Sequence, residues 1–242
     1  MILAIHPGDS AFVSGRMLMP TEGTSAIADV AIWSDNLLNS SLLIAFVILA
    51  LINLANLIDI IPSLLDCLWR WKGNLNIDAS LKLANPRNKV AAVMLLPVSL
   101  LASRYDLFQL EFCKSLSPAL QTLVAMGIVV LYVLVRRILF NLSTLSCRRM
   151  ETATAAHHSS FNYFIIASLM LFIALGVCMF LGKDDAIIRM VIYATGGLIY
   201  FVALVRKLQI FNSFCGPIQT ILYLCALEIL PTGAIIAASV LL

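Results

Sequence analysis

The chain alternates between long apolar stretches and short polar ones from residue 37 onward. An α-helix needs about 20 apolar residues to cross a bilayer, and several of the stretches reach that length. We therefore predict an all-α fold, a polytopic membrane protein built as a bundle of six transmembrane helices within residues 37–242. The predicted helices cover residues 37–61, 90–108, 119–141, 161–181, 186–205 and 217–241.

The segments outside these predicted helices have a different composition. Residues 1–36 mix polar and apolar side chains, and prolines and glycines interrupt any periodicity, so we predict an extramembrane tail with little regular structure. After the first helix, the stretch "WRWK" (69–72) alternates tryptophans with basic residues. This alternation is typical of chain that meets lipid headgroups. We predict an interfacial loop over residues 66–89.

The second predicted helix has the weakest apolar signal, because its apolar run (90–103) holds only 14 residues and contains Pro97. Basic residues help to decide whether it crosses, since cytoplasmic loops carry an excess of lysine and arginine. If it crosses, 11 of these residues lie on one side and 5 on the other; if it does not, the division is a more even 9 and 7. The uneven split predicts six helices, with both termini on the periplasmic side of a bacterial inner membrane. The residues assigned to the cytoplasm are Arg70, Lys72, Lys82, Arg87, Lys89, Arg136, Arg137, Arg148, Arg149, Arg206 and Lys207.

Composition supports a membrane protein and excludes some partners. Hydrophobic residues make up 61% of the chain and charged residues 12%, against about 45–50% and about 25% in soluble domains. The net charge of +3 is small, and the basic residues stand beside apolar runs, as topology signals do. We exclude nucleic acid as a partner. We expect the lipid bilayer, together with a membrane-protein partner or further copies of this chain.

An acidic residue in the last predicted helix is the strongest candidate for chemistry. Glu228 lies in "ILYLCALEILP" (221–231), 11 residues past Pro217, which is about 16 Å along a helix and close to mid-bilayer. A carboxylate at that depth needs a cation or several hydrogen-bond donors. We expect Arg136 to be its main charged partner. Arg136 and Arg137 point about 100° apart on their helix, so one can reach the headgroups while the other turns inward.

Further polar residues complete a predicted buried layer. Asn53, Asn56 and Asp59 recur every three residues along one face of the first helix. They form either a polar path or a set of hydrogen bonds between helices. Tyr223 is another possible donor to Glu228. The predicted layer comprises Asn53, Asn56, Asp59, Arg136, Tyr223 and Glu228.

Two features concern the fourth and fifth helices. Only "GKDDA" (182–186) joins them, which predicts an antiparallel hairpin. Within the fifth, "YATGGLIY" (193–200) contains Gly196 and Gly197, and small residues permit close contact between helices in lipid. We predict that these glycines are packing residues.

Motifs of common enzymes are absent from the sequence. We find no H-E-x-x-H, G-x-S-x-G, P-loop or Rossmann fingerprint. His157 and His158 are adjacent, so they diverge on a helix, and no Cys or acid follows four residues later to complete a ligand set. We therefore predict no catalytic residue, no metal and no cofactor.

One family resemblance is carried by two short motifs. The sequence "LYLCALEILP" (222–231), together with "FNYF" (161–164), resembles a Bacteroidota integral-membrane family, domain-of-unknown-function family 4271. The likeness covers about residues 37–242. It implies a multi-helix inner-membrane fold and a Bacteroidota source, and it marks Glu228 and its flanks as a hallmark. It implies no activity and no substrate.

These observations favour a non-enzymatic scaffold or assembly component of the cell envelope. The alternative is a small transporter or channel with a polar path through Asn53, Asn56, Arg136 and Glu228. An intramembrane enzyme is a third possibility. A water-filled cavity that reaches Glu228 would favour transport, whereas a closed bundle with an exposed apolar groove would favour the scaffold.

Overall fold

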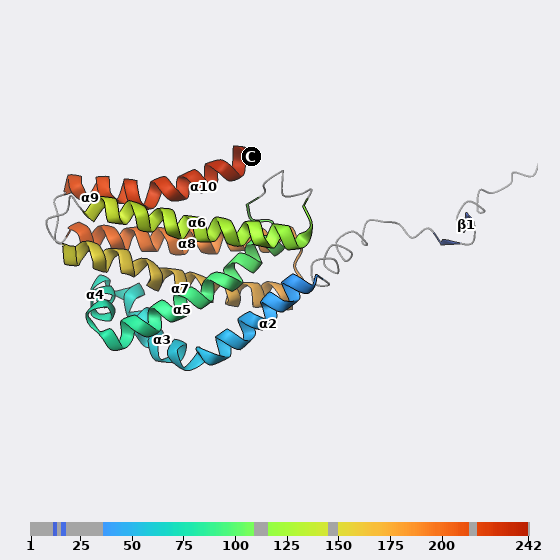
Figure 1. Cartoon of the computed structure of the whole chain (residues 1–242), viewed down its shortest axis with the longest axis horizontal. Coiled ribbons are helices and arrows are strands. Elements are labelled where there is room, and N and C mark those ends of the chain that lie inside the picture. The colour runs from blue at the N-terminus through green and yellow to red at the C-terminus, as the bar shows by residue number, and fades with distance from the viewer. Residues whose placement is uncertain are drawn as a thin grey trace, which may run out of the picture.

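The computed structural model describes residues 12–13, 16–17, 36–108, 116–144, 150–212 and 217–241. Long helices lie side by side in a bundle, which confirms the prediction of an all-α polytopic fold (Figure 1). Outside the bundle, the two-residue strands β1 (Phe12–Val13) and β2 (Arg16–Met17) pair antiparallel.

A bent pair of helices replaces the first predicted helix. Helices α2 (Leu37–Ile52) and α3 (Leu54–Trp69) meet at Asn53 with an angle of 69°. The side-chain amide of Asn53 donates to the carbonyl of Leu49 at 2.9 Å, and the backbone N–H of Asn53 donates to the same oxygen at 3.1 Å. A side chain that competes for a backbone carbonyl in this way bends a helix. The pattern of apolar residues continues through the bend and does not reveal it.

The predicted interfacial loop is helical. It contains the end of α3, then α4 (Trp71–Ala79) and the first residues of α5 (Leu81–Arg104). On α4 the side chains of Asn74 and Ile77 are 1% exposed, so this short helix buries one face against the bundle. Two helical turns of mixed polarity are too short to give a clear apolar period.

The remaining helices are long and apolar. They are α6 (Pro118–Thr144), α7 (Met150–Phe180), α8 (Asp185–Asn212), and a final span made of α9 (Pro217–Leu224), the π-helix η3 (Cys225–Ile229) and α10 (Leu230–Leu241). These four spans are long and apolar enough to cross a membrane, and the bent α2–α3 pair makes up to five. Helix α5 is not among these four spans or the bent pair, so the count of six crossings stays a prediction.

Helices α7 and α8 form an antiparallel hairpin. Gly182 adopts the left-handed conformation (φ 59°) at the end of α7, where glycine is favoured because it has no Cβ. The N–H of Lys183 donates to the carbonyl of Cys178 and that of Gly182 to Met179, each at 3.1 Å. These bonds close the helix end and turn the chain back within a few residues.

The main core lies where α3, α4, α5, α7 and α8 meet. Fully buried members include Ile60 of α3, Ile77 of α4 and Ile165 of α7. Figure 1 shows α2 beginning and α10 ending toward the same end of the bundle, with α4 at the opposite end. We call the latter the α4 end.

Candidate functional site

Four elements bring polar side chains together inside the bundle. The residues are Arg136 of α6, Ser160 of α7, Lys207 of α8 and Glu228 of η3, which we call the charged cluster. Arg136 Nη2 and Lys207 Nζ both donate to Glu228 Oε1, the latter at 2.5 Å. The same two nitrogens donate to Ser160 Oγ, each at 2.5 Å. One carboxylate oxygen and one hydroxyl therefore join three helices and the π-helix.

Burial makes this cluster energetically demanding. The side chain of Lys207 is 3% exposed, that of Glu228 8% and that of Arg136 14%. Removing charges from water costs several kcal/mol per ion, and close partners must offset the cost. With two cations and one carboxylate, the cluster has a formal charge of +1.

The π-helix turns Glu228 toward these cations. Pro231 has no N–H to continue the α-helical ladder, and just before it the N–H of Leu230 donates to the carbonyl of Cys225, five residues back. The carbonyl of Glu228 accepts from Tyr200 Oη at 3.0 Å and from Thr232 Oγ1 at 2.5 Å. The bond from Tyr200 holds the widened turn against α8, and the bond from Thr232 lies within the same span. Such π-helical turns are frequent at functional sites.

The structure places the predicted site residues in three regions. Arg136 and Glu228 meet in the charged cluster. Asn53 and Asn56 lie in the α2–α3 bend, where Asn56 Nδ2 donates to Asn53 Oδ1 at 3.3 Å, and Asp59 is exposed on α3. These three residues are not among the hydrogen-bond partners found for the Glu228 side chain in the described part of the chain.

Tyr223 and the two glycines also lie apart from the cluster contacts. The ring of Tyr223 packs on that of Phe211, with centroids 4.5 Å apart. A Cβ added at Gly196 or Gly197 would meet no atom within 4 Å. Within the described residues these glycines do not lie at a close helix contact. Gly73 does, because an added Cβ would lie 2.9 Å from the backbone carbon of Asp66.

Sequence reasoning missed Ser160 and Lys207 as partners of Glu228. Arg206 and Lys207 form an adjacent basic pair like Arg136 and Arg137, and neighbours on a helix point about 100° apart. Lys207 also follows Tyr200 by seven residues, which places both on one face. Arg206 instead donates to the carbonyls of Leu68 at 2.7 Å and Trp69 at 3.2 Å. The basic pair was therefore the signal that could have identified Lys207.

A second polar site contains uncharged side chains. Asn162 Nδ2 donates to Asn74 Oδ1, and Asn74 Nδ2 donates to Tyr163 Oη, both at 3.0 Å. Tyr163 Oη in turn donates to the carbonyl of Cys67 at 3.2 Å. We call Cys67, Asn74, Asn162 and Tyr163 the neutral network. It uses the "FNYF" motif to hold α3 and α4 against α7.

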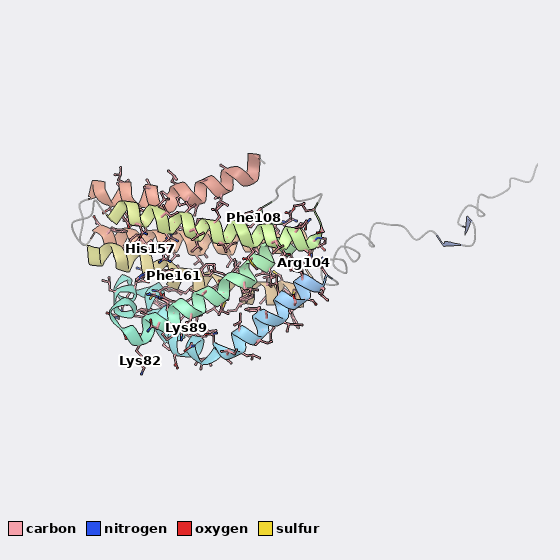
Figure 2. All side chains as sticks on the ribbon, viewed as in Figure 1. Lys82, Lys89, Arg104, Phe108, His157 and Phe161 are labelled. Carbon is pink, nitrogen blue, oxygen red and sulfur yellow. The ribbon has the colours of Figure 1, made fainter. Side chains whose placement is uncertain are left out.

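The paired histidines take part in packing. The ring of His157 stacks on Phe140 with centroids 4.1 Å apart and meets Phe161 edge-on at 6.0 Å. Figure 2 shows His157 and Phe161 together on α7. In the parts of the chain that the structure describes, no group of three or more His, Cys, Asp or Glu side chains could hold a metal ion.

An open apolar cavity lies in the angle between the α2–α3 bend and α5. Its volume is about 200 Å³, and we call it the apolar groove. A second cavity of about 20 Å³ lies near Ser103 and Gln121. Neither cavity is lined by a residue of the charged cluster. Residues lining the apolar groove include Phe46, Val47, Leu54, Leu57, Val93 and Met94.

Comparison with protein families agrees with the two motifs. A family model described as "Domain of unknown function (DUF4271)" matches residues 42–238. The chain belongs to this family. The matched DUF4271 region contains the charged cluster, the neutral network and the apolar groove. No curated protein and no solved structure matched the chain.

Proposed function

We propose that this DUF4271 protein is a non-enzymatic scaffold of the bacterial inner membrane that holds other envelope proteins during assembly. The apolar groove carries this proposal. Val47 and Leu54 on its α2–α3 wall are 45% and 47% exposed, and Val93 and Met94 of α5 form the facing wall. A transmembrane helix of a partner would fill the angle and bury side chains that α2 and α3 leave uncovered.

The closed state of the charged cluster supports a scaffold over a transporter. A transported solute needs a continuous path that crosses the bundle past the charges that bind it. The Glu228 side chain is 8% exposed, and the two cavities described above lie away from it. The cluster thus resembles a set of contacts that holds helices together more than a binding site on a transport path.

Photo-crosslinking tests the proposed docking surface. A photoreactive amino acid would replace Val47 in the groove, and a matched control would replace Leu222, which is 73% exposed on α9. We expect Val47→photo-residue to give an adduct with one membrane protein that also co-purifies in constant ratio in mild detergent. Equal adducts from both positions, or adducts with lipid alone, would contradict the scaffold.

A small transporter or channel is the second candidate, and the charged cluster at a π-helical turn favours it. Purified protein in sealed vesicles would then move a solute or ion, and Glu228→Gln would abolish the flux without unfolding the chain. An absence of flux across a panel of ions and small solutes would leave the scaffold as the better explanation.

We further infer a multi-pass topology with both termini in the periplasm and the α4 end in the cytoplasm, because basic residues concentrate there. Figure 2 shows Lys82 on α5 near the α4 end and Arg104 at the other end of that helix. Lys82→Cys and Lys183→Cys test this, since both side chains are exposed. An impermeant thiol reagent should label Lys183→Cys, and not Lys82→Cys, in cells with only the outer membrane opened. The wild-type chain is the background control, and the reverse pattern would overturn the orientation.

A further inference from the structure

We propose that the charged cluster binds a phosphate-type oxyanion with a single negative charge beside Arg136. The inference concerns a ligand site and stands apart from the scaffold function. It rests on the cluster's unbalanced charge, on an unpaired donor of Arg136 and on the position of Arg136 near the membrane surface.

The first argument is charge. Arg136 and Lys207 share one carboxylate, which leaves a formal +1 among side chains that are at most 14% exposed. The other acids on the same helices lie elsewhere: Asp185 contacts Arg104 at 3.9 Å, and Glu151 precedes Ser160 by nine residues, about 13 Å along α7. Helix α6 contains no acid. A buried cation without a counter-charge costs several kcal/mol, so an anion beside the cluster would be stabilising.

The second argument is hydrogen bonding. Arg136 Nη2 donates to Glu228 and Ser160, whereas the buried Nε has no hydrogen-bond partner among the described residues. A guanidinium presents its N–H groups in a planar fork that matches phosphate and carboxylate oxygens. An oxyanion beside Nε would satisfy this free donor while Nη2 retains its hydrogen bonds to Glu228 and Ser160.

The third argument is access. Arg136 has the most exposed side chain of the three ions and precedes Asn141, the last residue of the apolar span of α6, by five residues or about 8 Å. Ser160 follows His157, the first residue of the apolar span of α7, by three residues. Arg136 and Ser160 therefore lie toward the headgroup end of the cluster, whereas Glu228 lies near the middle of its own apolar span, Thr220–Ala237. Phosphodiesters of anionic lipids and inorganic phosphate both occur at the headgroup level that Arg136 approaches.

Thermal unfolding of the full chain in neutral detergent tests the site. The probes are phosphatidylglycerol, phosphatidylcholine and inorganic phosphate at constant ionic strength. We expect phosphatidylglycerol to raise the Tm of the wild type above its value in phosphatidylcholine. Lys207→Gln brings the cluster to zero charge and should weaken the apparent affinity about tenfold. Glu228→Gln brings it to +2 and should give a larger shift than the wild type.

Arg137→Gln is the matched control, because Arg137 is the exposed neighbour of Arg136 and lies outside the cluster. It should respond as the wild type does. An unchanged response in Lys207→Gln would overturn the site. If Lys207→Gln does not fold, Glu228→Gln decides, and a shift no larger than that of the wild type overturns it.

The same measurements identify the source of the oxyanion. A shift with phosphatidylglycerol and none with inorganic phosphate supports a lipid headgroup at Arg136. Equal shifts with both support a soluble phosphate. No difference between phosphatidylglycerol and phosphatidylcholine, together with no response to phosphate, would refute the proposal.

Discussion

The charged cluster and the neutral network are built on the same turn of α7 but work differently. Ser160 faces Arg136 and Lys207, whereas Asn162 and Tyr163 face α3 and α4. The charged cluster joins helices through long side chains that end on one carboxylate oxygen. The neutral network joins them through short amides, a phenol and a backbone carbonyl. One turn of α7 therefore binds two halves of the bundle by two kinds of contact.

The difference lies in what each site loses when one member is removed. In lipid, burial of apolar area does little to hold helices together, so polar contacts matter at both sites. Removing one partner of a buried ion pair strands a charge and costs about 3–5 kcal/mol. Removing one neutral hydrogen bond costs about 1 kcal/mol. The charged cluster should therefore be the more sensitive of the two.

The largest expected effect is that of Glu228→Ala. The change leaves Arg136 and Lys207 buried side by side without a carboxylate, and we expect a loss of about 3–5 kcal/mol of unfolding free energy. Glu228→Gln should lose less, because its amide oxygen still accepts a hydrogen bond. Thermal unfolding in detergent measures both.

A double-mutant cycle separates the pair from general packing. Arg136→Ala combined with Glu228→Ala should lose less than the sum of the single changes, because neither charge is then stranded by the other's removal. Additive losses would show that the two side chains act independently, and the contrast between the two polar sites would disappear.

The next largest effect is expected at Gly73, beside the neutral network. An added Cβ would lie 2.9 Å from the backbone carbon and from Oδ2 of Asp66, and 3.0 Å from the nitrogen of Cys67. The backbone of α3 would have to move, so Gly73→Ala should cost about 1–3 kcal/mol. Amide hydrogen exchange should rise in α4 and not in α8. A wild-type Tm would mean that α4 packs less tightly than this geometry requires.

Much of this fold could be predicted from the sequence because its signals are long. The apolar stretches that predict helices over 119–141, 161–181 and 186–205 correspond to α6, α7 and α8. Features that depend on one or a few residues could not be predicted from the sequence. A single asparagine bends α2–α3, and the two turns of α4 depend on tertiary contacts of Asn74 and Ile77. Neither effect alters local hydrophobicity.

The candidate site was predictable only in part, for a related reason. Depth along the helices paired Arg136 with Glu228, since a mid-membrane acid needs a cation. The same depth argument grouped Asn53 and Asn56 with them, but depth does not specify which helices are neighbours. The structure puts α6, α7 and α8 around η3, with the α2–α3 bend beside α5. Lys207 was overlooked because a basic residue near a helix end also signals topology.

A smaller effect is expected from Tyr163→Phe in the neutral network. The change removes the hydroxyl that accepts from Asn74 and donates to the carbonyl of Cys67, without altering the ring that packs in the core. We expect a loss of about 1 kcal/mol. Thermal unfolding of this variant beside Glu228→Gln compares the two sites through isosteric changes. A loss as large as that of Glu228→Ala would mean that the neutral network contributes as much as the charged cluster to the stability of the bundle.

The smallest effect is expected at Gly197, on the helix that supplies Lys207. An added Cβ there meets nothing within 4 Å, and the residue is exposed, so Gly197→Ala should change the free energy of unfolding by less than about 0.5 kcal/mol. Gly197→Leu should also be nearly neutral, because its side chain would extend into lipid. Gly73→Ala is the matched comparison, since it places the same methyl group against backbone. A loss from Gly197→Leu greater than that from Gly73→Ala would mean that this face of α8 lies against a second copy of the chain. Crosslinking through Leu198→Cys, which is 63% exposed beside it, would then yield a covalent dimer.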